Sequence, residues 1–257
     1  MRRRAQSTAW HVDMALLEVQ ELSKHFGGVR AVDRCSFAVK EGSITALIGP
    51  NGAGKTTVFN LISGLLKLDT GMIFLNEEQI DGLQPHQITR KGVRRTFQMT
   101  RDLMEMTVLE NMVVQSPTDG FMDIFKGGIL RGERDRAMDL LDFVGIAYLA
   151  KEKAKNLSFG QKKLMEFAAT LMKEPQLVLL DEPAGGINPA LLEEIVDRIR
   201  VLNKQGITFL IVEHNMDMVM SLCEPVIVMA YGKVLAEGPP ETIQNNKEVL
   251  EAYLGEA

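Results

Sequence analysis

Residues 49–56 read Gly49-Pro50-Asn51-Gly52-Ala53-Gly54-Lys55-Thr56. They follow an apolar run, Ile44 to Ile48, and open a segment from Lys55 to Leu65 that is compatible with a helix. The pattern G-x-x-x-x-G-K-[ST] in this setting predicts a turn whose backbone N–H groups surround a phosphate chain at the positive end of a helix dipole. In such a loop Lys55 reaches the β- and γ-phosphates, and the hydroxyl of Thr56 is offered to Mg²⁺.

A second apolar run ends in two carboxylates. Residues Leu177 to Leu180 are followed directly by Asp181 and Glu182. Charges at the end of a buried strand have to meet a cation, a partner or water, because an isolated buried charge is costly. Together with the phosphate loop, the pair predicts a metal ligand at Asp181 and, at Glu182, a base that polarises the attacking water.

The regions around these two motifs predict an α/β protein. Amphipathic helical patterns at Gly160 to Met172 and Ala190 to Leu202 alternate with apolar strands. Strand, helix and strand at this spacing require parallel pairing with helical crossovers. The predicted strands are Leu16 to Val19, Cys35 to Val39, Ile44 to Ile48, Met72 to Leu75, Leu177 to Leu180 and Thr208 to Val212, with a short strand after Pro225, a turn at Tyr231-Gly232 and a strand at Val234 to Ala236.

The middle of the chain, from about Pro85 to Leu157, has a different character. Helical patterns occur there at Pro85 to Arg90, Thr107 to Val114 and Arg131 to Phe143. We therefore expect a helical subdomain inserted into the α/β body. A glycine-rich connection within it either packs inside the subdomain, which is the simpler interpretation, or marks a partner surface. Its residues are Phe121, Phe125, Gly127 and Gly128.

Composition excludes several classes of protein. The 257 residues include 29 Lys or Arg and 34 Asp or Glu, a net charge of -5, with 46% hydrophobic and 25% charged residues. These values exclude a disordered, collagen-like or coiled-coil chain, and the acidic balance speaks against a general nucleic-acid binder. The apolar runs are far shorter than the roughly 20 residues that span a bilayer. Cys35 and Cys223 predict two reduced core thiols, as in a cytosolic protein.

The first residues are basic without being a targeting signal. Arg2, Arg3 and Arg4 resemble the start of a signal peptide, but no apolar segment follows before Asp13. We expect residues 1–13 to form a flexible tail or to lie upstream of a natural start at Met14.

The segment Leu157-Ser158-Phe159-Gly160-Gln161 resembles the LSGGQ signature of the ATP-binding cassette (ABC) family, with Phe159 in place of the first glycine. A Ser and a Gly that open a helix present N–H groups and a hydroxyl suited to a γ-phosphate. Further motifs of the family occur in the family's order. Gln98 matches the Q-loop glutamine, His214 the switch histidine and Phe26 the aromatic residue that lies against adenine.

The resemblance implies a fold and a site. The implied fold is α/β, a P-loop NTPase of ABC ATPase type with an antiparallel β subdomain, a parallel-sheet core and an inserted helical subdomain. It implies a single ATP-binding domain over residues 14–257, with the helical subdomain at about residues 85–172. The implied catalytic residues are Glu182, His214 and Gln98, and the implied metal ligands are Thr56, Gln98 and Asp181. The implied ATP-binding residues are Phe26, Gly49, Pro50, Asn51, Gly52, Ala53, Gly54, Lys55, Thr56, Thr57, Ser158, Phe159, Gly160 and Gln161.

Four further stretches are similar to the ATPase subunits of branched-chain amino acid importers. They are residues 92–98, 182–189, 212–216 and 252–257, although the helix after the signature lacks an arginine often found near its end. The resemblance implies that ATP hydrolysis with Mg²⁺ powers uptake of branched-chain amino acids through two separate membrane permease subunits, with an external binding protein selecting the substrate. Two cassettes would pair head to tail, as a homodimer or a heterodimer, at the cytoplasmic face of the membrane. The expected docking surface for the permeases is Gln98, Met99, Asp102, Leu103 and Met104.

Two alternatives stay open at the level of sequence. The cargo is another small amide such as urea, or a lipid, since the cargo never touches this chain. Alternatively, the chain is a soluble cassette ATPase that handles DNA or ribosomes. Support for that alternative is a basic cluster without intervening acids, Arg90, Lys91, Arg94, Arg95 and Arg101. Against it, the sequence contains no twin cassette and no long heptad insertion.

Overall fold

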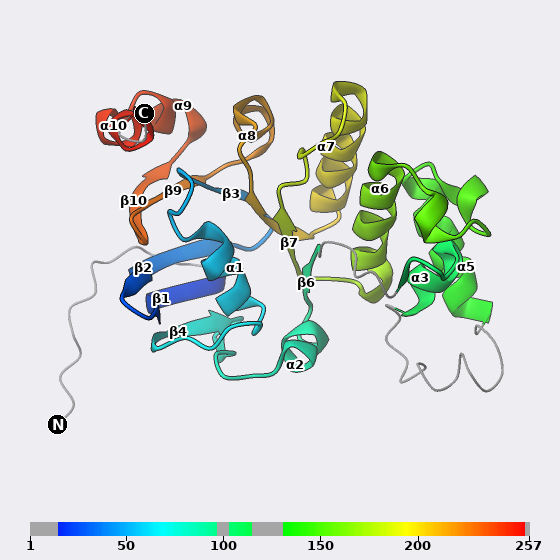
Figure 1. The fold of residues 1–257 in the computed structure, drawn as a ribbon, viewed down its shortest axis with the longest axis horizontal. Coiled ribbons are helices and arrows are strands. Elements are labelled where there is room, and N and C mark those ends of the chain that lie inside the picture. The colour runs from blue at the N-terminus through cyan, green and yellow to red at the C-terminus, as the bar shows by residue number, and fades with distance from the viewer. Residues whose placement is uncertain (1–14, 97–102, 115–130, 255–257) are drawn as a thin grey trace.

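The protein is built from two sheets. The computed structural model describes residues 15–96, 103–114 and 131–254, and Figure 1 shows its ribbon. One sheet has four strands in the antiparallel order β2-β1-β4-β5, and the other has six in the order β10-β9-β3-β8-β7-β6. Within the larger sheet only the edge strand β10 is antiparallel to its neighbour. The predicted α/β architecture, with an antiparallel part and a parallel-sheet core, is therefore confirmed.

The elements follow one another in short units. The strands are β1 (Ala15–Phe26), β2 (Val29–Lys40), β3 (Ile44–Ile48), β4 (Thr70–Leu75), β5 (Glu78–Gln79), β6 (Val93–Arg95), β7 (Leu177–Asp181), β8 (Thr208–Val212), β9 (Val226–Ala230) and β10 (Lys233–Gly238). The helices are α1 (Lys55–Ile62), α2 (Pro85–Arg90), α3 (Val108–Val114), α5 (Arg131–Phe143), α6 (Phe159–Thr170), α7 (Pro189–Lys204), α8 (Met216–Leu222), α9 (Pro240–Gln244) and α10 (Lys247–Leu254). Short 3₁₀ turns lie at Ala147–Leu149, Ala154–Asn156 and Leu171–Lys173.

The larger sheet is the middle layer of the molecule, because its strands are buried on both faces. Along β7, Val178 and Leu180 join one hydrophobic cluster, whereas Leu177 and Leu179 join the other. Continuous apolar strands of this kind are typical of parallel sheets covered on both sides. The first cluster joins the sheet to the helices α6, α7 and α8, and the second joins it to α1 and the antiparallel sheet.

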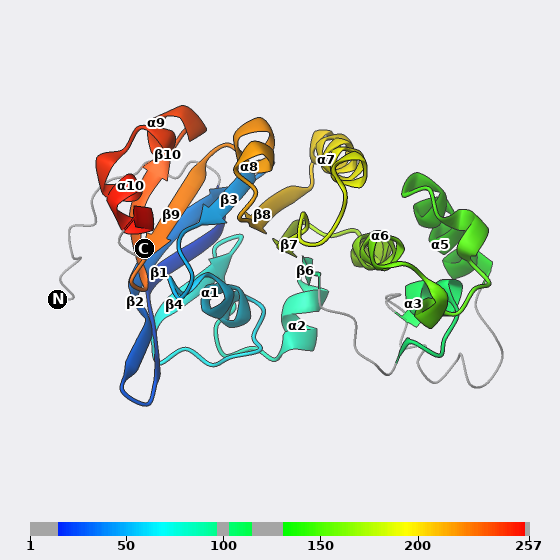
Figure 2. The same cartoon turned by 45° about the horizontal axis from the view of Figure 1, so that its top comes forward.

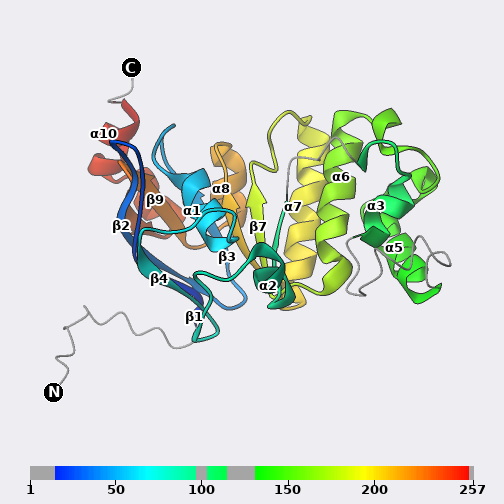
Figure 3. The same cartoon turned by 60° about the horizontal axis from the view of Figure 1, so that its bottom comes forward.

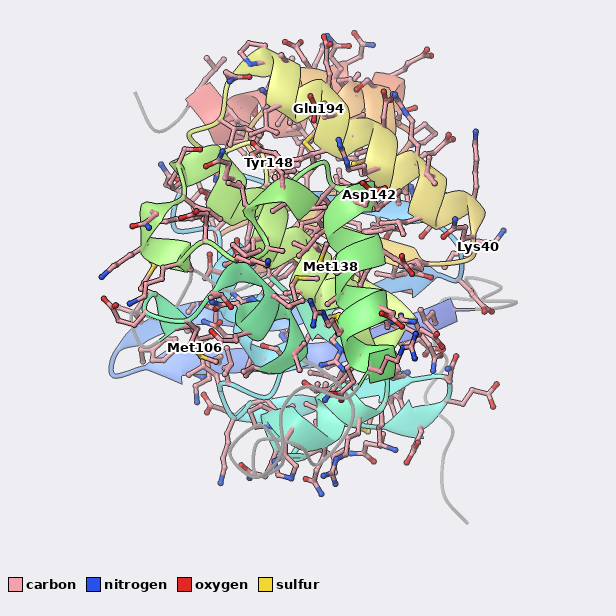
Figure 4. The ribbon with its side chains drawn as sticks, turned by 90° about the vertical axis from the view of Figure 1, so that its right-hand side faces the viewer. Lys40, Met106, Met138, Asp142, Tyr148 and Glu194 are labelled. Carbon is pink, nitrogen blue, oxygen red and sulfur yellow. The ribbon has the colours of Figure 1, made fainter. Side chains whose placement is uncertain are left out.

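Helices dominate the end of the molecule that lies beyond β7. Figures 1, 2 and 3 show α3, α5 and α6 gathered there, on the far side of β7 from the antiparallel sheet. The three helices contact one another and share a buried apolar cluster that includes Met112, Leu141 and Phe167. Figure 4 views this end directly, with Met138 and Asp142 on α5 and Glu194 on α7.

Three details differ from the sequence predictions. Helix α1 ends at Ile62 rather than Leu65, because Gly64 takes a left-handed φ of 72° just beyond it. Strands β1 and β2 are each 12 residues long, much longer than the predicted runs. The elements β5, β6 and α8 were not predicted, and the two strands have only two and three residues, too few for an alternating pattern to emerge.

Other predictions have simpler outcomes. Cys35 and Cys223 are buried and free, as predicted. No helix among the described residues is long and apolar enough to cross a membrane. Several predictions fall outside the described residues and concern the segment 1–13 and Gln98, Met99, Arg101, Asp102, Phe121, Phe125, Gly127 and Gly128.

Candidate active site

Three strands deliver the predicted motifs to one edge of the parallel sheet. Strands β3, β8 and β7 are parallel neighbours, so their carboxyl ends lie side by side. The phosphate loop follows β3, the two predicted carboxylates stand at the end of β7, and His214 follows β8. Ligands of open parallel sheets bind at this edge. The topology therefore brings together groups that lie far apart in the sequence.

The phosphate loop contains two glycines at which no side chain fits. Gly49 has a φ of 146°, and a Cβ added to it would overlap the carbonyl oxygen of Met229 in β9. Gly54 has a φ of 102°, and its Cβ would overlap the carbonyl oxygen of Ala31 in β2. Only glycine satisfies both the conformation and the space. The loop backbone is consequently packed directly against β9 and β2.

Lys55 lies buried at the start of α1, with only 6% of its surface exposed. Its Nζ donates to the carbonyl oxygens of Gly49 and Pro50, at 2.6 and 2.8 Å. The ammonium group is thereby held against the loop to which it belongs. Beside it in the first turn of α1, Thr56 is exposed and Thr57 is half-buried.

Phe26 presents an aromatic ring at the tip of the β1–β2 hairpin, with 46% of its surface exposed. Asp69 fixes this tip, because its carboxylate accepts from Lys24 Nζ at 2.8 Å and from the His25 backbone N–H at 2.6 Å. These hydrogen bonds lower the pKa of Asp69 to about 2, and the bond from Lys24 contributes most. Lys24 Nζ also lies 5.7 Å from the centre of the Phe26 ring. An exposed ring on a fixed hairpin is suited to stacking on a planar ligand.

Asp181 is held by an arginine. Arg95 Nη2 donates to Asp181 Oδ2 at 2.8 Å, and Arg95 Nη1 donates to Asn60 Oδ1 in α1 at 2.6 Å. The Arg95 side chain is only 8% exposed and the Asp181 side chain 24%. The hydroxyl oxygen of Thr96 accepts from the Asp181 N–H at 3.2 Å. The end of β6 is thus joined both to the carboxylate strand and to the helix of the phosphate loop.

Glu182 and His214 form a close pair at the same edge. His214 Nε2 and Glu182 Oε1 are 3.0 Å apart, and both side chains are partly open to solvent. Glu182 has a φ of 50°, a conformation that is costly for a residue other than glycine and that concentrates at functional sites. Its N–H donates to the Val212 carbonyl oxygen at 2.9 Å, and Lys163 Nζ donates to its carbonyl oxygen at 2.6 Å. The pair has the geometry of a general base with an orienting partner.

The signature segment forms the exposed N-terminus of α6. Ser158 is the N-cap, and its Oγ accepts from the Gln161 N–H at 3.3 Å while Gln161 Oε1 accepts from the Ser158 N–H at 2.8 Å. This capping box leaves the start of the helix in solvent. The Phe159 ring, 57% exposed, lies against Gly186, and Gly160 packs against Leu191 of α7. Such a helix N-terminus is suited to an anion.

The predicted site residues therefore fall into two separate groups. One group is the phosphate loop with Asp181, Glu182 and His214, and the other is Ser158 to Gln161. Figures 1, 2 and 3 show α1 and α6 on opposite sides of β7. The chain does not place its own signature over its own phosphate loop. Gln98 lies outside the described residues.

The structure adds four residues to which the sequence assigned no role in the site, namely Arg95, Lys163, Glu213 and Asp69. It also changes the interpretation of the basic cluster, because Arg94 is only 9% exposed and Arg95 is committed to Asp181. Burial lowers the pKa of Arg94 to about 10. Arg94 and Arg95 therefore do not form a solvated basic face, and the nucleic-acid alternative loses two of the five residues that supported it.

The residues present fit a nucleoside triphosphate and Mg²⁺. The loop leads into the N-terminus of α1, where backbone N–H groups suit a phosphate, and it carries a buried ammonium group. Among the described residues, no group of three or more His, Cys, Asp and Glu side chains is placed to hold an ion. Mg²⁺ at phosphate sites needs only one or two protein oxygens, because the phosphates supply the others. The Thr56 hydroxyl and the Asp181 carboxylate could supply these oxygen ligands.

Known proteins share both the sequence and the fold. A family model described as "ABC transporter" matches residues 32–185. This chain belongs to the ABC transporter family. A second model, "Branched-chain amino acid ATP-binding cassette transporter", matches residues 233–257 of the cassette. The probable branched-chain amino acid transport ATP-binding protein LivG of Archaeoglobus fulgidus is 42% identical over 247 residues, which cover 94% of this cassette and 96% of the relative.

Solved ABC cassettes superpose closely. The ADP conformation of the cassette MJ1267 has a TM-score of 0.85 and 34% identity, covering 94% of this cassette and 99% of that chain. The dimeric structure of MJ0796, a bacterial ABC transporter cassette, has a TM-score of 0.75 and 25% identity, covering 87% and 98%. The predicted family, fold and class of enzyme, an ABC ATPase, are therefore confirmed.

Proposed function

We propose that this cassette hydrolyses ATP to power the transport of branched-chain amino acids across a membrane. The meeting of the phosphate loop, Asp181 and the Glu182–His214 pair at one sheet edge supports hydrolysis. The match of residues 233–257 to branched-chain amino acid cassettes, and the 42% identity to a LivG protein, support the cargo.

ATP would bind with its phosphates on the loop of residues 49–54 and its adenine on the exposed ring of Phe26. The loop N–H groups and the N-terminus of α1 meet the phosphate charge, and Lys55 adds a full positive charge beside them. Thr56 and Asp181, with Gln98, would hold Mg²⁺. When bound, the ion neutralises charge that builds on the phosphate oxygens.

Glu182 would act as the base for the attacking water. Water attacks the γ-phosphorus, the bond to the leaving ADP oxygen breaks, and the proton of the water passes to the Glu182 carboxylate. His214, 3.0 Å from Glu182 Oε1, keeps that carboxylate in one orientation. The left-handed backbone at Glu182 supports this assignment, because strain of that kind persists where a site needs it.

A second cassette would complete the site. Helix α6, which begins with the signature, lies on the other side of β7 from α1 and the chain's own phosphate loop, so a partner's signature has to approach the bound ATP from outside. The dimeric structure of MJ0796 supports pairing of this kind. The partner is another copy of this chain or a different cassette.

The cassette would work at the membrane surface, through two permease subunits that receive substrate from an external binding protein. We place the docking surface beside Gln98 and Met104, in a helical subdomain of about residues 85–172 within a domain of residues 14–257. The 42% identity to LivG, a probable transport ATP-binding protein, supports a role beside membrane permeases.

Hydrolysis is tested by Glu182→Gln, with Glu193→Gln as the control, since Glu193 is exposed on α7. The first variant should bind ATP with the affinity of the unmodified protein, and its turnover should fall at least 100-fold, the range for loss of a positioned base. The control should keep its turnover. Normal turnover in Glu182→Gln would remove Glu182 from the mechanism.

Cargo is tested in membrane vesicles that carry this cassette together with two permease subunits and a substrate-binding protein of a branched-chain amino acid transporter. Uptake of labelled leucine should require ATP and should stop with the Glu182→Gln cassette. Labelled urea and a labelled lipid are the competing cargoes. ATP-dependent movement of either, without leucine uptake, would overturn the amino acid assignment and leave ATP hydrolysis intact.

A further inference from the structure

Two loops control the distance between Glu182 and His214. Strands β7 and β8 pair as far as Asp181 and Val212, and beyond that register the ladder ends. Residues 182–188 then lead from β7 to α7, and residues 213–215 lead from β8 to α8. The last backbone bond between the two segments, from the Glu182 N–H to the Val212 carbonyl oxygen, ends at Glu182 itself. The residues that follow in both loops need a further contact to stay together and to keep the 3.0 Å separation of the pair.

Glu213 makes that contact. The side chain is buried, with 2% of its surface exposed, and it accepts three backbone hydrogen bonds. Oε1 accepts from the Ala184 N–H at 2.6 Å, whereas Oε2 accepts from the N–H groups of His214 and Asn215 at 2.7 and 2.9 Å. One carboxylate therefore binds the loop of Glu182 with one oxygen and the loop of His214 with the other.

The arrangement matches the chemistry of a carboxylate. A carboxylate accepts hydrogen bonds at both oxygens, and bonds from N–H groups to an ionised acceptor are among the strongest in proteins. Burial adds to their effect, since water does not compete for the same groups. A side chain that only filled space here would be apolar, and a buried charge is retained only with partners of this kind.

The backbone of Glu182 is anchored on both sides. Its own N–H donates to Val212, and two residues later the N–H of Ala184 donates to Glu213. Between these two hydrogen bonds Glu182 keeps a φ of 50°. A residue other than glycine would leave this costly conformation if the hydrogen bonds were lost. Loss of the Ala184 anchor would free the base, and loss of the other two bonds would free His214.

We propose that Glu213 is a positioning residue for ATP hydrolysis, which fixes the Glu182–His214 pair by joining the loops 182–188 and 213–215. This inference rests on the proposed roles of Glu182 and His214. Glu213 touches neither ATP nor water in the reaction and acts only through its three backbone bonds.

The test is Glu213→Gln, which keeps the shape and presents an N–H group to one of the two loops. Turnover should fall about 100-fold, as expected when a reacting group moves by about 1 Å. The Kd for a non-hydrolysable ATP analogue should stay within about twofold, because the phosphate loop is unchanged. Glu213→Asp, which keeps the charge and shortens the reach, should recover part of the turnover. Normal turnover in Glu213→Gln would overturn the proposal.

A double-mutant cycle with His214→Ala separates positioning from general damage. If Glu213 acts through the pair, adding Glu213→Gln to His214→Ala should lower turnover by less than threefold further, because the geometry to be protected is already lost. A double variant whose turnover falls by the full product of the two single-variant factors would overturn the proposal. Normal turnover in His214→Ala alone would instead overturn the proposed role of His214.

Hydrogen exchange can be measured on the unmodified protein, so this test does not depend on whether a variant folds. The amides of Ala184 and His214 lie in loops, yet both should exchange as slowly as amides of β7 and β8. Exchange at the rate of an exposed turn amide such as that of Glu77 would contradict the proposal, even if Glu213→Gln failed to fold.

Discussion

The phosphate loop and the signature helix α6 are both suited to phosphate, but only the loop is enclosed by its own chain. Gly49 and Gly54 are pressed against β9 and β2, and the ammonium of Lys55 is buried against the loop carbonyls. At α6, by contrast, Ser158 and Phe159 are exposed to solvent. The difference indicates that the loop is organised before ATP arrives, and it agrees with the proposal that the exposed signature meets ATP on a partner cassette.

The two regions also treat buried charge differently. Lys55 donates to two carbonyl oxygens, so its charge has partners inside the fold. On α6, the Oε1 atom of Glu166 is buried without a hydrogen-bond partner. Burial raises the pKa of this carboxyl to about 7, and nearby Asp181 adds to the rise. The ammonium group of Lys55 thus has hydrogen-bond partners within the fold, whereas the buried Oε1 atom of Glu166 has none.

The largest effect is expected from Gly49→Ala, which changes the enclosed phosphate loop. The added Cβ would overlap the backbone of Met229, and that backbone cannot rotate away as a side chain could. The free energy of unfolding should fall by roughly 3 kcal/mol or more, and ATP binding should be lost. Urea unfolding and titration with a fluorescent ATP analogue measure the two outcomes.

Gly132→Ala is the matched control, because Gly132 lies at the exposed start of α5 with open space around its Cα. It should leave ATP binding unchanged and leave the unfolding free energy equal or slightly higher. Equal losses in both variants would mean that the packing behind the loop has no special role.

Glu166→Gln sharpens the comparison on the α6 side through its pH dependence. The folded pKa of about 7 lies above the ordinary value of 4.5, so the stabilising contribution of the protonated side chain is present below pH 4.5. It is lost as the pH rises through 7. The variant should therefore match the unmodified protein at pH 4 and exceed its stability at pH 8.5 by about 3 kcal/mol. Equal stability at both pH values would contradict this explanation.

Lys163→Met tests how α6 supports the base. Lys163 Nζ donates to the Glu182 carbonyl oxygen at 2.6 Å and lies 5.7 Å from the centre of the Phe159 ring. Loss of one exposed hydrogen bond should lower kcat about fivefold and leave the Kd for ATP unchanged. Lys162→Met, one residue earlier on the same helix, is the control for loss of charge. A matching loss in the control would show a charge effect only.

Asp69→Asn should give the smallest effect, at the adenine end of the enclosed region. It weakens the bonds that hold Lys24 and His25 beside Phe26, so the Kd for ATP should rise about threefold at pH 7. Since the folded pKa of about 2 lies below the ordinary 3.8, the contribution of Asp69 to stability is complete above pH 3.8 and is lost as the pH falls through 2. The stability difference between variant and parent should therefore be constant from pH 7 to pH 5. A difference that disappeared above pH 5 would contradict this assignment.

The sequence was informative wherever a local pattern determines a local structure. The apolar runs before Gly49 and Asp181 are strands because both faces of the parallel sheet are buried, and such strands need no alternation. The glycine pattern located the loop because two of its positions admit no side chain. These features need no knowledge of distant neighbours.

The missed residues depend on distant neighbours. Arg95 matters because β6 pairs with β7 and brings it to Asp181, a contact between segments 86 positions apart. Glu213 could have been noticed, since a charge directly after the buried strand β8 obeys the rule that singled out Asp181. Its partner Ala184 is a backbone group, however, and no residue type signals a backbone donor.

We propose that the phosphate loop binds ATP within one chain and that the signature does not. The most direct measurement is the Kd of a non-hydrolysable ATP analogue for Lys55→Ala and Ser158→Ala, in solution dilute enough to keep the cassette monomeric. Lys55→Ala should weaken binding about 100-fold, since it removes charge-assisted bonds to phosphate. Ser158→Ala should bind within about twofold of the unmodified protein. Equal weakening in the two variants would contradict the account.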